Sequence, residues 1–113
     1  MALGITTKDA QGLINHINEQ IRIKKIETWQ RPDLTKNEYY HITTNQQWKG
    51  IAAVATIIYN EDKTRLLRID VVVKPQNTKL TDSDKGYLYG RFVELLIVHC
   101  ADKYDVIAYK EKW

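Results

Sequence analysis

The sequence predicts an α+β fold: an N-terminal helix, an antiparallel sheet of three to four strands, a long apolar second helix packed on the sheet, and a segment near the C-terminus that suits an edge strand. Two observations support this prediction. Apolar residues recur at helical spacing in two segments, and the chain between them is rich in β-branched and aromatic residues. With 113 residues, 43% of them hydrophobic, the chain suits a single globular domain spanning residues 1–113.

The first helix is predicted from about Thr7 to Lys24. Thr6 followed three residues later by Asp9 has the form of a capping box. The apolar residues that define its buried face are Ala10, Leu13, Ile14, Ile17 and Ile21. The stretch RPDLTKN at residues 31–37 collects turn-forming residues, so we expect a loop there.

Four segments are predicted as strands. KIETWQ at residues 25–30 and EYYHITT at residues 38–44 are short and rich in aromatic or β-branched residues. The two clearest strands run from Trp48 to Tyr59 and from Thr64 to Lys74, and the loop NEDK joins them as a hairpin.

A four-residue loop places Tyr59 opposite Thr64 and Val54 opposite Ile69. The face predicted to enter the core then carries Ala52, Val54, Thr56 and Ile58. The other face mixes apolar and charged residues, a composition typical of neither a core nor a solvated surface: Ile51, Ala53, Ala55, Ile57, Leu66, Arg68, Asp70 and Val72.

The second helix is predicted within residues 80–104, with Thr81, Asp82 and Ser83 as candidate N-caps. Its apolar residues surround most of the helix, so we expect it to be packed on both sides. The closing YDVIAYK alternates and is predicted as an edge strand or as a segment that reaches another chain.

No catalytic or metal-binding pattern is visible in the sequence. The three histidines, His16, His41 and His99, fall in different predicted elements and lack the paired spacing of metal ligands. Cys100, the single cysteine, lies on the most apolar helix, where a buried thiol is normally inert. We therefore predict a non-enzyme without a cofactor or a metal.

Charge and hydropathy indicate the compartment. The formal net charge of +3 is mildly basic, and no apolar run approaches the ~20 residues that cross a bilayer. The lone cysteine excludes an intramolecular disulfide. We expect a cytoplasmic protein without a membrane partner.

The preferred hypothesis is a small non-catalytic binding or accessory module that acts through protein–protein contacts, either with a protein partner or with a second copy of itself in a homodimer. Inhibitors and accessory factors of mobile elements often have this form, which is an association only. Tyr and Trp outnumber the single Phe92 ten to one, and such side chains suit interfaces. The interface candidates are Ile51, Ile57, Leu66, Val72, Tyr109 and Trp113.

The alternative hypothesis is a nucleic-acid-binding domain that uses a basic strand surface. Five Lys or Arg residues and one acidic residue lie between Lys63 and Lys79. In the strand predicted from Trp48 to Tyr59, the positions at which RNA-recognition motifs stack bases on aromatic rings hold Ile51, Ala53 and Thr56 instead. The candidates for this function are Arg65, Arg68, Lys74, Lys79, Lys24, Lys25 and Arg31, with Trp29 or Trp48 stacking on bases.

Overall fold

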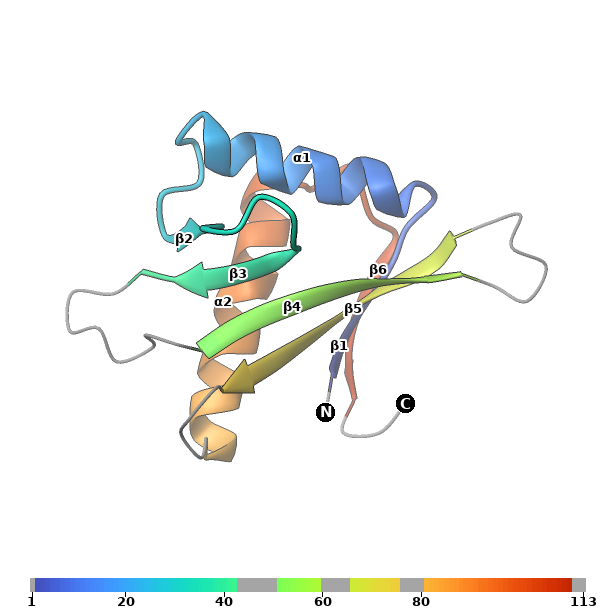
Figure 1. Cartoon of the computed structure of the whole chain (residues 1–113). Helices are drawn as coiled ribbons and strands as arrows, with labels where there is room; N and C mark the ends of the chain where they lie inside the picture. The colour runs from blue at the N-terminus through green and yellow to red at the C-terminus, as the bar shows by residue number, and fades with distance from the viewer. Residues whose placement is uncertain (1, 43–50, 60–65, 76–80, 111–113) are drawn as a thin grey trace.

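The structure is a computed structural model that describes residues 2–42, 51–59, 66–75 and 81–110 (Figure 1). These residues form two helices and six strands, which confirms the predicted α+β class. The helices are α1 (Ala10–Arg22) and α2 (Asp82–His99). The strands are β1 (Ala2–Thr6), β2 (Trp29–Gln30), β3 (Glu38–His41), β4 (Ile51–Tyr59), β5 (Leu66–Pro75) and β6 (Val106–Lys110).

The strands form one antiparallel sheet in the order β2-β3-β4-β5-β1-β6. The four predicted strand segments and the predicted C-terminal edge strand are all present, and the described sheet has one further strand, β1, which was not predicted. β1 lies between β5 and β6, so its backbone is paired on both sides. Its side chains Leu3 and Ile5 are buried in the core.

Both helices contribute to a core on one face of this sheet. In Figure 1, α2 crosses behind the strands and α1 runs along the upper end of the sheet. Strand pairing places Leu3, Tyr39, Ala53 and Ala55 on the same side, and all four belong to one buried cluster with residues of both helices. The opposite face of the described sheet carries no helix.

The β4–β5 hairpin is present, but its predicted register is wrong. Val54 lies opposite Val72 instead of Ile69, and Tyr59 lies opposite Leu66 after an irregularity between Ile58 and Tyr59. The register is therefore displaced by three residues, and an odd displacement exchanges the two faces of a strand. The loop residues themselves lie outside the described part of the chain.

The exchange of faces overturns the predicted core face. Ile51, Ala53 and Ala55 point into the core, and Ile57 packs against it. Ala52, Val54, Thr56 and Ile58 lie on the face without helices.

The shorter segments follow the prediction in part. β6 is an edge strand, as expected for the C-terminal alternation, and it pairs with β1 on one side only. The predicted strand at residues 25–30 contracts to Trp29–Gln30, and the loop at residues 31–37 is found where it was expected.

Both helices begin at polar caps. α1 begins after Asp9, whose carboxylate accepts a hydrogen bond from the Gly12 amide at 2.8 Å. The helix therefore starts three residues later than predicted, and the predicted capping box was wrong because Asp9 is the N-cap and Thr6 belongs to β1. α2 begins after Thr81, which forms a capping box with Asp84.

α2 is packed on one side, and the prediction that it would be packed on both sides was wrong. Leu88, Phe92 and Leu96 are buried against the sheet and α1. On the outer side of the helix, the side chains of Ile97 and Val98 are 55% and 66% exposed. An apolar helix with an uncovered outer side is unusual in a monomeric domain.

Candidate functional site

Four residues of α2 form a line along its outer side, here called the α2 stripe: Tyr87, Arg91, Glu94 and Val98. Their spacing of i, i+4, i+7 and i+11 keeps them on one face of a helix. Tyr87 is 40% exposed, and Arg91 and Glu94 are exposed as well. The stripe is therefore apolar or aromatic at both ends and charged in the middle.

The side chains of the α2 stripe contact one another. The Arg91 guanidinium lies 5.0 Å from the centre of the Tyr87 ring, a cation–π contact. Its Nη1 atom donates a hydrogen bond of 3.0 Å to Oε2 of Glu94. A side-chain hydrogen bond with Tyr87 and the charge of Glu94 raise the pKa of Arg91 above its ordinary value, so this residue stays cationic.

A groove of about 420 Å³ adjoins the α2 stripe. One wall is α2, from Tyr87 to His99, and the other is the segment from Lys25 to Trp29. His41 of β3 also lines it. Charged and aromatic side chains thus surround a hollow of the size that receives side chains of a partner or a small ligand.

His41 is a titratable group of this groove that is surrounded by aromatic rings. Its ring lies 4.9 Å from Trp29 and 6.0 Å from Tyr87, in both cases edge to face. Burial lowers the pKa of His41, the charge of Arg91 lowers it further, and Glu94 opposes the shift. Its Nδ1 atom is buried and has no hydrogen-bond partner among the described residues.

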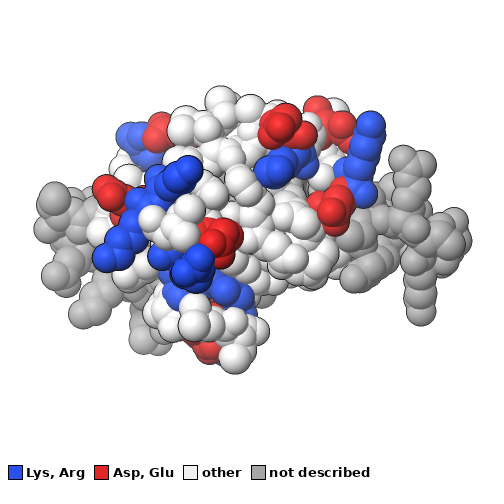
Figure 2. Space-filling view, turned by 90° about the horizontal axis from the view of Figure 1, so that it is seen from above, with Lys and Arg blue, Asp and Glu red and all other residues white. Residues whose placement is uncertain are grey.

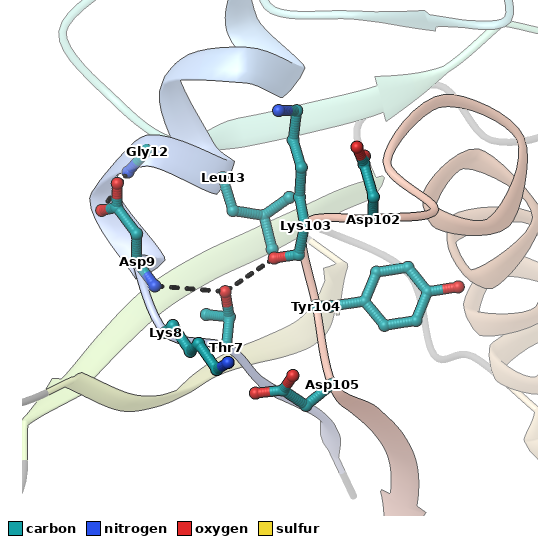
Figure 3. Close-up of a pocket in the computed structure, with 9 residues that line it drawn as sticks. All are labelled: Thr7, Lys8, Asp9, Gly12, Leu13, Asp102, Lys103, Tyr104 and Asp105. Carbon is teal, nitrogen blue, oxygen red and sulfur yellow. Dashed lines mark hydrogen bonds between the residues drawn. The ribbon is translucent and has the colours of Figure 1, made fainter.

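A second hollow, of about 340 Å³, lies where the β1–α1 turn meets the connection from α2 to β6 (Figure 3). The Thr7 hydroxyl donates to the Lys103 carbonyl at 2.7 Å, and the Asp105 amide donates to the Thr6 carbonyl at the same distance. Asp9 points towards Gly12, whose amide it caps. These contacts hold the β1–α1 turn against the connection from α2 to β6.

The predicted interface residues are separated by the structure. Ile51 is 5% exposed, so the prediction that it meets a partner was wrong. Ile57 is partly buried and packs against the core. Val72 is half-buried on the sheet face without helices. Tyr109 is exposed on β6 and its ring lies 5.2 Å from that of Tyr89. The Leu66 side chain and Trp113 lie outside the described part of the chain.

The predicted nucleic-acid residues are separated as well. Trp29 is 3% exposed and packs edge to face on Phe92 at 5.4 Å, so its ring is not accessible to a base and that prediction was wrong. Lys24 and Lys25 are exposed after α1, whereas Arg31 is partly buried and donates to the Lys36 carbonyl at 2.8 Å. The remaining candidates lie outside the described residues or have side chains that do: Arg65, Arg68, Lys74, Lys79 and Trp48.

The described surface carries mixed charge. Seen from above, Lys and Arg side chains gather towards one side of the molecule, but carboxylates lie among them (Figure 2). On α1, for example, the Glu19 carboxylate is paired with Arg22. This face is therefore weakly polarised.

The α2 stripe was not predicted from the sequence. The spacing of its four residues is visible in the sequence, but apolar residues surround most of this helix. The side of α2 that faces solvent is determined by the burial of Leu88, Phe92 and Leu96 in the core.

Compared with family models, with curated proteins and with solved structures, the chain gives no match. None of the described helices combines the length and the apolar character that crossing a membrane requires.

Proposed function

We propose that the chain is a non-catalytic protein-binding module whose binding surface is the α2 stripe with its adjoining groove. A module of this kind acts as an inhibitor or an accessory factor by covering a partner's surface. The observation that supports the proposal is the exposed apolar and aromatic outer side of α2, a helix whose inner side already supplies the core.

The composition of the α2 stripe suits a protein interface. Tyr and Arg are enriched among the residues that contribute most to binding, and both are present at adjacent turns, as Tyr87 and Arg91. Ile97 and Val98 add apolar area beside them. Exposed apolar residues gathered on one side of a domain typically mark a site of association.

Two features of the described residues support a non-catalytic role. Burial raises the pKa of the Cys100 thiol to about 11, so the single cysteine is a poor nucleophile at neutral pH. Among the described residues, His, Cys, Asp and Glu side chains do not gather in a group of three or more that could hold a metal ion.

Photo-crosslinking in the cells that produce the protein tests the proposal. A photoreactive phenylalanine analogue replaces Val98 in one variant and Leu34 in a control variant. Leu34 is 76% exposed and does not line the groove beside α2, so the control has a similar apolar side chain on another surface. We expect a protein adduct of discrete mass from position 98 and not from position 34. Equal adduct formation at both positions, or none at position 98, contradicts the proposal.

Nucleic-acid binding is the second candidate, and the exposed Lys24 and Lys25 favour it. Binding through phosphate contacts weakens steeply as salt rises, because bound counterions are released on association. A Lys24→Glu, Lys25→Glu double variant would lower the affinity for a DNA or RNA oligonucleotide at low salt. Oligonucleotide binding that is insensitive to both salt and these substitutions argues against this function.

A further inference from the structure

The order of residues along the α2 stripe is self-complementary. Read from the N-terminal end, the stripe is aromatic, cationic, anionic and apolar: Tyr87, Arg91, Glu94 and Val98. When a second stripe is laid against the first in the opposite direction, each cation meets an anion. Each aromatic residue then meets an apolar one.

From this pattern we infer that the partner of the α2 stripe is a second copy of the chain, bound antiparallel about a two-fold axis that passes between Arg91 and Glu94. Arg91 of each copy then pairs with Glu94 of the other, and Tyr87 packs on Val98 of the other copy. The inference rests on the proposed function and names the partner of the same surface. A two-fold axis makes every contact occur twice, as in most homodimers.

The charges of Arg91 and Glu94 favour the antiparallel direction and the register in which each Arg91 faces the other copy's Glu94. In a parallel pair, Arg91 would face Arg91 and Glu94 would face Glu94, and such like-charged contacts are unfavourable. A shift of one helical turn along the antiparallel pair also separates each cation from its anion. Antiparallel alignment in addition opposes the two helix dipoles, which favours the same arrangement.

In the single chain, Arg91 pairs with Glu94, and this pair can be exchanged for pairs between two copies. The pair between Arg91 and Glu94 within one chain is exposed, with side-chain exposures of 43% and 62%, and such surface pairs contribute little to folding. Gly90 lies beside the stripe, and a Cβ atom placed there would meet nothing within 4 Å. Two helix backbones can therefore approach closely at this point.

The expected dimer is weak and concentration-dependent. α2 has 18 residues and is about 27 Å long, so a single helix pair falls at the low end of the range of stable interfaces. Much of the selectivity comes from two ion pairs near the surface, so association should weaken as salt rises.

Charge reversal with mixing tests the inference. Arg91→Glu and Glu94→Arg are made separately, and native mass spectrometry and light scattering report the mass of each variant and of their equimolar mixture. Each variant alone places like charges across the two-fold axis, so its self-association should weaken on the order of tenfold. In the mixture, every position 91 meets an opposite charge at position 94, so a heterodimer should form preferentially.

The matched controls are Arg22→Glu and Glu19→Arg, which reverse a second Arg–Glu pair at i, i+3 spacing among the described residues, on α1. These variants should dimerise as the unsubstituted chain does, and mixing them should change nothing. The double variant R91E/E94R in one chain should recover self-association, which separates a charge effect from a folding defect.

A wild-type chain that is monomeric at every concentration overturns the inference. So do charge-reversed variants that dimerise as well as the wild type or show no preference for each other. In that case, an adduct between position 98 and a different protein would still support the proposed function. A monomeric wild type that also forms no adduct at position 98 would refute both the dimer and the proposed function.

Discussion

Replacing Gly12 with Ala should fail to stabilise α1, although Ala is the better helix former. An exposed Gly→Ala change in a helix usually raises the free energy of unfolding by up to about 1 kcal/mol. At Gly12, however, the new Cβ would lie 2.3 Å from Oδ2 and 2.7 Å from Cγ of Asp9. Real Cβ atoms do not approach so closely, so the Asp9 carboxylate must move.

Moving the Asp9 carboxylate lowers the free energy of unfolding, and this loss opposes the gain from replacing Gly with Ala. Asp9 is the N-cap, and its Oδ1 accepts the Gly12 amide at 2.8 Å. The loss of such a cap costs about 1 kcal/mol, within a range of about 0.5–2. The two effects nearly cancel, so Gly12→Ala alone should leave the free energy of unfolding unchanged within about 0.5 kcal/mol.

A double-mutant cycle with Asp9→Ala measures this coupling. Asp9→Ala alone should destabilise the protein by about 1 kcal/mol, and adding Gly12→Ala should then restore about 1 kcal/mol because the clash has gone. The assay is urea unfolding followed by circular dichroism, at a dilution where association is absent. Gly86→Ala in α2, where a Cβ meets nothing within 4 Å, is the control and should gain about 1 kcal/mol. An equal gain from Gly12→Ala with and without Asp9 would refute the assignment of Asp9 as the cap.

Two further predictions concern titratable groups. Burial raises the pKa of Cys100 to about 11, so about one thiol in a thousand is ionised at pH 8. A thiol reagent such as Ellman's should therefore label Cys100 far more slowly in the folded than in the urea-unfolded chain. Equal labelling rates would place Cys100 at the surface. Burial lowers the pKa of His41 below its ordinary 6.5, so the unfolded chain binds more protons and the free energy of unfolding should fall as pH drops through 6.5. His41→Phe keeps a ring beside Trp29 and should flatten this part of the pH profile, and an unchanged profile would contradict the assignment.

Helices and the central hairpin could be predicted because their signals are local. The apolar spacing of α1 and the capping residues before α2 lie within a few residues of one another. β1 could not be predicted in the same way, since Ala2–Thr6 is short and becomes a strand by pairing with β5 and β6, both far away in the sequence. Propensity carries no information about such distant pairing.

The register of the hairpin shows how a small local error changes a functional prediction. A displacement of three residues moved Ile51 from a supposed interface into the core. The α2 stripe was obscured for a related reason: an apolar helix has several possible inner sides, and only tertiary packing selects one. The candidate site therefore required the structure, even though every residue in it is visible in the sequence.

The most direct test of the dimer inferred for the α2 stripe is the absolute mass of the wild type and of a Val98→Asp variant, by light scattering behind a sizing column at about 0.1 M and 0.5 M salt. Val98 is exposed in the single chain, so this substitution should leave folding intact while placing a buried charge in any interface on α2. We predict that at 0.1 M salt the wild type approaches twice its chain mass of 13.2 kDa as its concentration rises, and that the variant stays at one chain mass. Equal masses for the two proteins, or a wild-type monomer that carries nucleic acid removable at 0.5 M salt, would contradict this assignment.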